Sequence, residues 1–187
     1  MTFAELAQLT RSVRRFHQDR KISADELLGM VDVARMAPCA ANLQKLRYSI
    51  VEDRELCREI FPAVRWAGYL EDWSGPRPGE RPPAYIVIQA PRKEQKYTRI
   101  DVGIAAAYLV LAAGAHGIGA CMIMSFDEDV VHGAVGSPEG YHPVLLVALG
   151  HPAEEVILED DSERIEYWRD ESSRHHVPKL PLDEVIY

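Results

Sequence analysis

The sequence has few cysteines, no excess of basic residues and no long hydrophobic run. Its 187 residues include three cysteines, Cys39, Cys57 and Cys121, and these form no C-x-x-C pair. An odd number of scattered cysteines provides no disulfide framework, so we expect free thiols and a reducing, cytoplasmic setting. The first ten residues contain Glu5 and no basic start followed by an apolar run. We therefore expect no signal peptide.

Basic residues are outnumbered by acidic ones, 21 to 29, which gives a formal net charge of −8. This balance argues against general nucleic-acid binding, which needs a basic face to displace counterions. The acids are concentrated in residues 154–171, where nine acids stand against two arginines and give a local charge of −7. We interpret that block as solvated surface. The longest uncharged apolar run, Ile104 to Ala115, is too short to span a bilayer, so no membrane partner is expected.

Several common cofactor and catalytic motifs are also missing. Gly117-Ile118-Gly119 has two of the three glycines of a dinucleotide-binding fingerprint and follows an expected helix, so we interpret it as a helix C-cap. The pair His175-His176 lacks the spacing of helical or finger-type ligands, and no metal site is predicted. No G-x-S-x-G elbow or Ser/His/Asp order occurs, and nothing marks Cys39 as an activated nucleophile.

The remaining pattern predicts one domain, residues 1–187, in which helices and strands alternate. The run Asp101–His116 is apolar on all sides, so we expect a central buried helix there. The other helices are expected over Thr2–Leu9, from a capping box at Ser23-Ala24-Asp25-Glu26 to before Pro38, from Asp53 to about Phe61, and from Asp127 to about Val135. Strands are expected over Arg47–Val51, Ala84–Ala90, Ala120–Ser125, Pro143–Gly150 and Leu182–Tyr187.

Two segments do not fit this alternation. Residues 62–83 contain five prolines together with Trp66, Tyr69 and Trp73, and we interpret them as a loop that is either a packed cover or a wall of a substrate pocket. Residues 165–187 alternate aromatic, charged and proline residues, with a turn expected near Asp170–Ser173. Such a tail is poorly suited to a separate core, so it either wraps its own sheet or reaches a second subunit.

Two short segments carry the functional prediction. Arg11-Ser12-Val13-Arg14-Arg15-Phe16 places three guanidinium groups within five residues, and arginines bind phosphate and stabilise anions. Pro38-Cys39-Ala40-Ala41-Asn42-Leu43-Gln44 supplies two side-chain amides, which can both donate to and accept from the edge of a heterocycle. A solvated basic patch and amides that bond a turn are the alternatives. Together the segments favour a site for a phosphorylated planar cofactor.

The order of these motifs resembles that of the FMN-dependent nitroreductase-like oxidoreductases over nearly the whole chain. The opening Arg11–Phe16 is similar to R-S-x-R-x-F, and Pro38–Gln44 to P-S-x-x-N-x-Q. The later matches are Asp101-Val102-Gly103-Ile104-Ala105, Gly117-Ile118-Gly119, Val147-Ala148-Leu149-Gly150-His151-Pro152 and the basic tail Pro178–Val185. The sequence departs from the family where Cys39 replaces Ser and where Lys45-Leu46 replaces Pro-Trp.

The resemblance implies an α+β fold, with a central, mostly antiparallel sheet flanked by helices. It also implies a homodimer in which the C-terminal tail extends to the partner and both chains build each FMN site. By position, Arg11 and Lys179 would hold the phosphate with help from Ser12, and Arg14 would stabilise the flavin anion. The partner chain would supply Pro38, Cys39, Ala40, Asn42 and Gln44, and the backbone of Met124 and Ser125 would approach the ring.

The function implied is transfer of hydride from NAD(P)H to FMN, followed by reduction of a nitroaromatic, a quinone or a similar small acceptor in a ping-pong reaction. FMN would carry the chemistry, so no catalytic protein nucleophile is expected. Two alternatives stay open. One is other flavin chemistry on the same fold, such as flavin fragmentation or reductive dehalogenation, and the other is a flavin-binding module without enzymatic activity.

Overall fold

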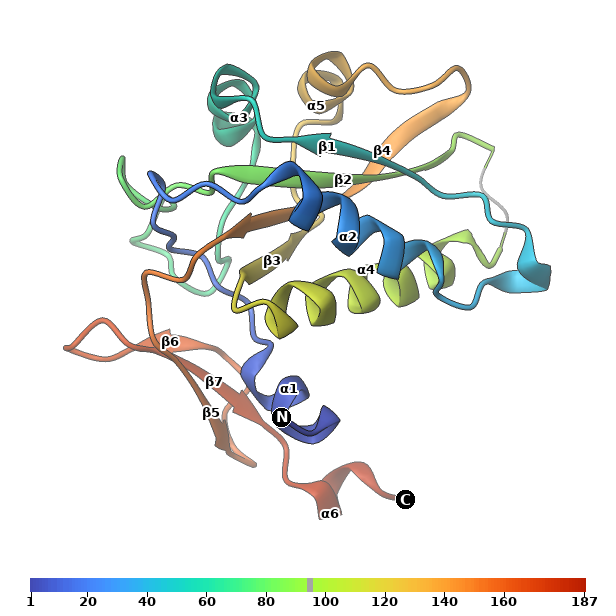
Figure 1. Ribbon diagram of the computed structural model, residues 1–187. Helices are drawn as coiled ribbons and strands as arrows, with labels where there is room; N and C mark the ends of the chain where they lie inside the picture. The colour runs from blue at the N-terminus through green and yellow to red at the C-terminus, as the bar shows by residue number, and fades with distance from the viewer. Residues whose placement is uncertain (94–95) are drawn as a thin grey trace.

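The computed structural model describes residues 1–93 and 96–187. Its centre is a four-stranded sheet in the order β1-β2-β4-β3, and every neighbouring pair is antiparallel (Figure 1). The strands are β1 (Arg47–Val51), β2 (Ala84–Pro91), β3 (Gly119–Ile123) and β4 (Tyr141–Gly150). The predicted fold class, a mostly antiparallel sheet flanked by helices, is confirmed.

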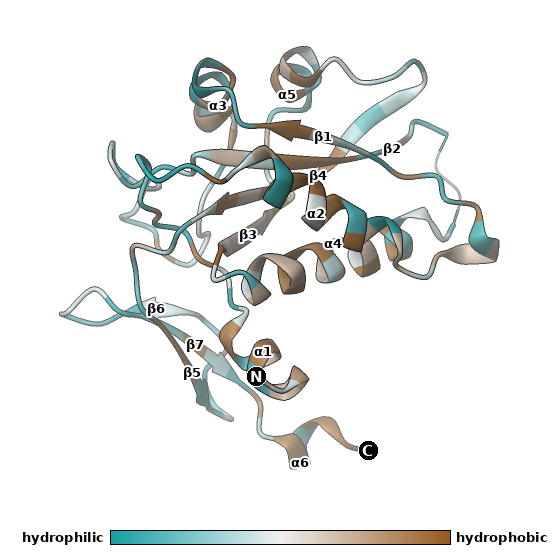
Figure 2. Ribbon diagram, in the orientation of Figure 1, coloured by the Kyte–Doolittle hydropathy of each residue, from teal (hydrophilic) through white to brown (hydrophobic). Residues whose placement is uncertain are grey.

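The two central strands are buried because helices cover both faces of the sheet. Every residue of β2 from Ala84 to Ala90 is buried, and so is β4 from Leu145 to Gly150. Strands buried on both sides are nearly continuous runs of Val, Ile and Leu, which is the sequence pattern found here. Figure 2 shows β1–β4 mainly in the hydrophobic colour and the surrounding loops mainly in the hydrophilic one.

Two helices lie on each face of the sheet. α2 (Ala24–Arg35) and α4 (Thr98–Ala115) cover one face, and α3 (Arg54–Ile60) and α5 (Glu128–Val135) cover the other (Figure 1). The predicted caps are confirmed. Ser23 and Glu26 form a capping box on α2, and the Asp53 and Asp127 carboxylates accept from backbone N–H groups that start α3 and α5.

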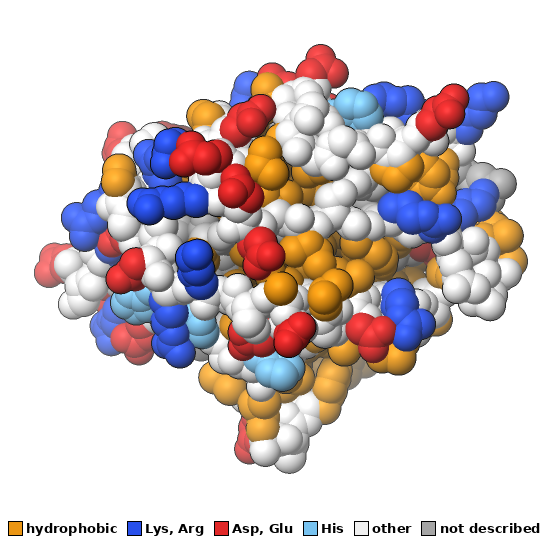
Figure 3. Space-filling view, turned by 45° about the horizontal axis from the view of Figure 1, so that its top comes forward, with side chains coloured by type: hydrophobic (Ala, Val, Ile, Leu, Met, Phe, Trp, Pro, Cys, Tyr) orange, Lys and Arg blue, Asp and Glu red, His pale blue; other side chains and the backbone are white. Residues whose placement is uncertain are grey.

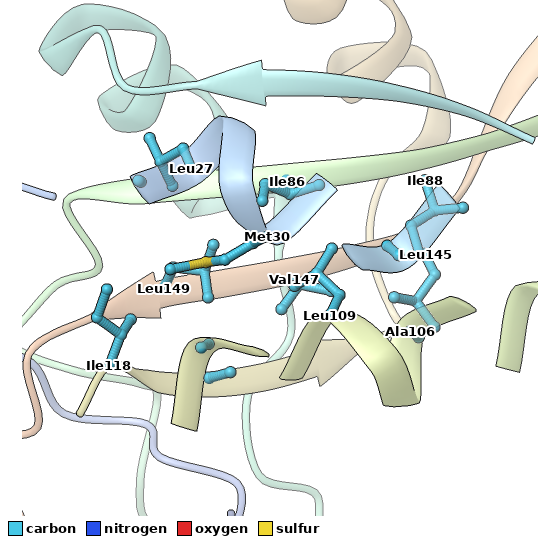
Figure 4. Packing of buried hydrophobic residues seen from close by; sticks show 14 of the residues in the cluster. Leu27, Met30, Ile86, Ile88, Ala106, Leu109, Ile118, Leu145, Val147 and Leu149 are labelled. Carbon is cyan, nitrogen blue, oxygen red and sulfur yellow. The ribbon is translucent and has the colours of Figure 1, made fainter. Parts of the chain in front are cut away.

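The core between the sheet and α2 and α4 is built from interdigitated aliphatic side chains (Figure 4). Leu27 and Met30 extend from α2 and Ala106 and Leu109 from α4, toward residues of β2 and β4. On the opposite face a second cluster includes Phe16, which is fully buried. A Cβ added at Gly150 would lie 2.8 Å from both Phe16 and Pro83, so only glycine lets these elements approach so closely.

Helix α4 differs from the expectation of burial on all sides. Asp101, Val102, Ala105, Ala106, Leu109 and Ala113 face the core, but Gly103, Ala107 and Tyr108 are exposed. Among the described residues this 18-residue helix alone is long and apolar enough, at a mean hydropathy of 1.4, to cross a membrane. A core helix passes the same test, and one face of α4 packs on the sheet. In the space-filling view, hydrophobic side chains gather near the middle and at the lower tip (Figure 3).

The C-terminal segment forms a small sheet of its own, in the order β5-β7-β6. Its strands are β5 (Val156–Asp160), β6 (Trp168–Arg169) and β7 (His175–Lys179), and it lies near α1 (Phe3–Leu9) (Figure 1). The expected strand over Leu182–Tyr187 is wrong, because α6 (Leu182–Val185) is a short helix. Pro181 precedes it directly and fixes a backbone angle suited to a helix start.

The acidic block 154–171 is not solvated throughout. The side chain of Glu154 is 0% exposed and forms a 2.8 Å ion pair with Arg169. The same carboxylate accepts the backbone N–H groups of Arg14 and Arg15 at 2.5 and 3.1 Å. Three donors therefore compensate for the burial of this charge. The sequence showed a run of acids, but not which of them would turn inward.

Candidate functional site

The basic segment Arg11–Phe16 runs along the outer edge of the sheet. The N–H of Val13 donates to the carbonyl of Ala120 at 2.9 Å, and Ser12 pairs with Ala120 in a parallel bridge. Because β3 is an edge strand, it offers backbone groups beyond this bridge to another partner. The segment therefore places its cations at the beginning of an open strand edge.

The three predicted arginines have different surroundings. Arg15 makes two contacts with the Glu80 carboxylate, at 2.7 and 3.1 Å, which raise the pKa of Arg15 and lower that of Glu80. Arg11 donates one Nη2 bond to the carbonyl of Ala7 at 2.7 Å. Its Nε is buried and has no acceptor in the described part of the chain. Arg11 therefore keeps an unused donor, whereas Arg15 is a structural ion pair.

Arg14 is 9% exposed and is enclosed by the C-terminal segment. Its Nη1 lies 2.8 Å from Nε2 of His175, and its guanidinium carbon lies 4.4 Å from the centre of the Tyr167 ring. Burial, helped by the nearby Arg14 and Arg169 charges, lowers the pKa of His175 to about 3. His175 is therefore neutral and accepts the Arg14 bond. No carboxylate of the described residues forms an ion pair with the Arg14 guanidinium, so its positive charge is not offset by a salt bridge.

Met124 and Ser125 directly follow β3. Met124 is 76% exposed, and the carbonyl of Ser125 accepts the N–H of Arg65 at 2.9 Å. Met124 lies four positions beyond Ala120, which corresponds to about 13 Å along a strand. The basic segment and the Met124–Ser125 backbone therefore stand at the two ends of one strand edge.

The segment Pro38–Gln44, here called the amide loop, has a strained backbone. It includes the 3-10 helix η1 (Ala40–Asn42), and Ala41, Asn42 and Gln44 all have positive φ angles of 48°, 52° and 48°. Such angles cost free energy for residues with a side chain. The Asp101 carboxylate of α4 holds the loop by accepting the N–H of Ala40 at 2.9 Å. Asp101, the first residue of the D-x-G-x-A motif, thus anchors this loop.

The loop borders a cavity of about 280 Å³ between α2, α4 and the start of β1. Pro38, Cys39 and Gln44 line it together with Tyr48. The Gln44 N–H donates to the Cys39 sulfur at 3.4 Å, and Gln44 Nε2 donates to the Asn42 carbonyl at 3.3 Å. Burial, with a smaller contribution from the Cys39 thiol, raises the pKa of Tyr48. The cavity is partly apolar and offers amide and hydroxyl groups for hydrogen bonds.

The two halves of the predicted site lie at opposite ends of α4 within one chain. Ala40 bonds to Asp101 near the beginning of the helix, whereas a Cβ added at Gly114 near its end would lie 2.4 Å from the Thr10 hydroxyl. Thirteen helical residues separate these points by about 20 Å. Residues 38–44 therefore do not meet the basic segment in a single chain.

Lys179 lies at the end of β7, where its carbonyl accepts the N–H of Asp161 at 2.9 Å. Its side chain is exposed and has no recorded contact with Arg11 or Ser12 in the described residues. No group of three or more His, Cys, Asp or Glu side chains suited to a metal ion occurs among those residues. All three cysteines are free.

Three residues that contact these segments were not predicted from the sequence to belong to the site. Tyr167 and His175 surround Arg14, and Asp101 anchors the loop. Aromatic and histidine residues in a charged tail gave no signal that they would face Arg14. The aspartate was part of a recognised motif, and its position in a predicted buried helix indicated that it needs a polar partner.

The chain matches a known family over most of its length. The family model described as Nitroreductase family matches residues 9–151, and the chain belongs to this family. The match ends just before the C-terminal sheet. Tyr167 and His175, which enclose Arg14, therefore lie outside the matched part.

Individual relatives cover most of the chain. It is 27% identical to a protein of Thermotoga neapolitana named iodotyrosine deiodinase, over 97% of this chain and 94% of that protein. It is 28% identical to a protein of Archaeoglobus fulgidus named putative NADH dehydrogenase/NAD(P)H nitroreductase, over 78% of this chain and 83% of that protein. A structure named FMN-dependent nitroreductase, from Clostridium difficile R20291, shares the fold at 22% identity with a TM-score of 0.65, over 79% and 87% of the two chains.

Proposed function

We propose that the protein is a cytoplasmic FMN-dependent oxidoreductase that takes hydride from NAD(P)H and reduces a nitroaromatic, a quinone or a similar small acceptor by a ping-pong reaction. The observation that carries this proposal is the edge of β3. Arg11 and Ser12 stand at one end of it, and the Met124–Ser125 backbone stands about 13 Å away at the other. That spacing suits a cofactor with a phosphate at one end and a ring at the other.

The residues present fit the phosphate end of FMN. Arg11 has a buried Nε donor for which the described residues supply no acceptor, and a phosphate oxygen would satisfy it. Ser12 adds a hydroxyl at the same point of the edge. Lys179 would add a third contact from the C-terminal segment, and its exposed side chain is long enough to change direction.

Arg14 fits the role of a cation near the ring. Its partner His175 is neutral, so the guanidinium charge remains available to stabilise a nearby anion. When bound, FMN supplies the hydride chemistry, and the protein binds and orients it. Tyr167 now covers one face of the guanidinium, so the proposal requires the cofactor to use the edge of Arg14 or to displace Tyr167.

The separation of the two half-sites supports a homodimer. Because about 20 Å of α4 lies between them, a second copy is needed to bring Pro38, Cys39, Ala40, Asn42 and Gln44 to the basic segment. The exposed apolar face of α4 offers a surface for that copy. Light scattering on the purified protein should give twice the mass of one chain, and Tyr108→Glu on that face should weaken the dimer and FMN binding together. A stable FMN-loaded monomer would contradict this assembly.

A second candidate is reductive dehalogenation of an aromatic substrate. The similarity to the relative named iodotyrosine deiodinase extends over 97% of this chain and 94% of that protein. The loop 62–83 supports an aromatic pocket because Trp73 lies under the Arg169 guanidinium at 4.2 Å, and Tyr69 meets Tyr167 edge-on at 5.0 Å. Steady-state turnover with menadione and with iodotyrosine, each with the same reductant, separates the two candidates.

The first experiment is spectroscopic. Protein purified or reconstituted with FMN should show a flavin absorption band, which should bleach when NADH or NADPH is added without oxygen and return when menadione is added. A clear preference for FAD would contradict the cofactor assignment. A bound flavin that neither nucleotide reduces would contradict the enzymatic proposal and favour a binding module.

A further inference from the structure

A second groove shares no lining residue with the candidate flavin site. It runs between α3, the end of β1 and the segment that leads into β2, and its volume is about 650 Å³. Its α3 side lies by β1, at the edge of the sheet opposite β3, and its other side is formed by Gln18–Lys21, which continue from the basic segment, and by Pro78–Pro83. Its volume is within the usual range for a site that binds a small organic molecule.

The groove is basic although the whole chain is acidic. Four cationic residues line it, against two acidic ones, Asp19 and Glu52. The cations are Lys21, Arg54, Arg58 and Arg81. Arg58 pairs with Glu55 at 2.8 Å, but no ion pair is recorded for the other three in the described part of the chain. In a protein with a net charge of −8, three cations at one groove that form no ion pair within residues 1–93 and 96–187 favour an anionic ligand.

Arg81 is held in a fixed orientation. Its guanidinium carbon lies 4.1 Å from the centre of the Phe61 ring, and its Nε is buried with no acceptor among the described residues. Stacking on a ring fixes the plane of the donors, which lowers the entropy cost of binding an anion. The orphaned Nε shows that the protein itself leaves part of this arginine unsatisfied.

Part of the groove lining, called the floor below, is apolar and uncharged. Phe61, Pro82 and Pro83 contribute ring surfaces. Cys57 also lines it, and burial raises the pKa of this thiol to about 12, so it stays neutral. A bare inorganic anion would leave these surfaces unused. A flat ring attached to a phosphate would use both the floor and the cations.

We propose that this groove binds a phosphate monoester of mononucleotide size. The phosphate lies among Lys21, Arg54 and Arg81, and the attached ring packs against the two prolines and the edge of Phe61, because Arg81 already covers one face of that ring. Asp19 and Glu52 accept hydrogen bonds from sugar hydroxyls or a ring amino group. The proposal concerns a different part of the molecule from the flavin site and does not depend on the proposed reaction.

The test is calorimetric titration with 5′-AMP of the protein as purified, without added FMN, because FMN is itself a phosphate monoester and in excess would compete for the groove. AMP should bind in a saturable manner, and adenosine and inorganic phosphate should each bind at least about tenfold more weakly, since each lacks one part of the ligand. The double variant Lys21→Glu/Arg54→Glu should also lose at least about tenfold in AMP affinity. Both positions are exposed, and an acid in the first turn of α3 favours the helix.

Lys93→Glu is the matched control. This exposed lysine follows the far end of β2, a strand about 26 Å long, and makes one of the two charge reversals of the double variant, away from the groove. Its AMP affinity should equal that of the unmodified protein. The proposal is overturned if AMP gives no saturable binding, if inorganic phosphate binds as tightly as AMP, if the double variant binds AMP normally, or if Lys93→Glu weakens binding equally.

Discussion

Arg14 and His175 are 161 positions apart in the sequence, yet Nη1 of Arg14 lies 2.8 Å from Nε2 of His175. The bond joins the basic segment at the edge of the main sheet to the first residue of β7. His175 is fully buried, and the Arg14 charge is one reason for its low pKa. The contact therefore links the ionisation of one tail histidine to the environment of the arginine proposed to act on the cofactor.

The buried His175 should make the stability of the protein dependent on pH. Its pKa is about 3 in the folded chain, compared with a reference value of 6.5. The unfolded chain therefore takes up the proton first, so the stabilisation is complete above pH 6.5 and is lost as the pH falls toward 3. Lowering the pH from 7 to 5 should therefore reduce the free energy of unfolding by about 2 kcal/mol through protonation of this residue in the unfolded chain.

Urea unfolding at several pH values, with His175→Gln as the comparison, measures this contribution. Glutamine keeps an acceptor and cannot take up the proton. Between pH 7 and pH 5 the free energy of unfolding of the variant should therefore fall by about 2 kcal/mol less than that of the unmodified protein. Parallel curves for the two proteins would mean that His175 is protonated equally in the folded and unfolded chains.

Arg14→Ala should slow reduction of bound FMN more than it weakens FMN binding. The proposed partner of Arg14 is charge that develops on the reduced ring, and one charge-assisted contact is worth about 1.5–3 kcal/mol, or roughly ten- to over a hundredfold in rate. Stopped-flow reduction by NADH and the reduction potential provide the measurements. His175→Gln is the control because it alters the same bond but keeps the guanidinium. An unchanged rate and potential in Arg14→Ala would exclude this role.

Two glycine substitutions should have opposite effects on stability. Gly150→Ala places a Cβ 2.8 Å from Phe16 and from Pro83 in a packed region, so it should lower the free energy of unfolding by about 1–3 kcal/mol. Gly133→Ala lies on an exposed position of α5 with no atom within 4 Å of the new Cβ. It should raise stability by up to about 1 kcal/mol through helix propensity. Thermal unfolding of both variants distinguishes close packing from a general effect of the methyl group.

The strain of the amide loop can be measured with two neighbouring alanines. Ala41 has a φ of 48°, so Ala41→Gly should raise the unfolding free energy by about 0.5–1 kcal/mol. Ala40 is not among the residues with positive φ, and Ala40→Gly should lower it by about 0.5–1 kcal/mol. Chemical denaturation gives both values. Equal destabilisation by the two substitutions would mean that the left-handed angle at Ala41 carries no strain.

Truncation after Gly150 should abolish both FMN retention and solubility. The deletion removes Lys179 and the Glu154 carboxylate that accepts the N–H groups of Arg14 and Arg15. It also uncovers buried side chains of the basic segment. Recovery in the soluble fraction and visible absorbance provide the readout. A soluble, FMN-loaded truncated dimer would show that the tail is dispensable and would remove Lys179 from the site.

The sequence predicted the local elements well because their signals are local. The Ser23 capping box, the Asp53 and Asp127 caps and the continuous aliphatic strands each depend on a few neighbouring residues. The tail was harder to predict because its partners are distant. β7 pairs in parallel with β5, and no local pattern shows that Glu154 and His175 would be buried against residues 11–16. The positions of Arg11, Ser12 and the amide loop were recognised by motif order, and their roles stay predictions.

The bonds from Glu154 and His175 to residues 14 and 15 also have a consequence for the order of folding during synthesis. A chain is made from its N-terminus, and α1 to β4 are complete before residue 154 has left the ribosome. The sheet can form at that stage, but the N–H groups of Arg14 and Arg15 still lack their acceptor. The basic segment is thus among the first parts to be translated and among the last to reach its final contacts, so a stalled nascent chain would hold the sheet beside an incomplete form of the proposed cofactor site.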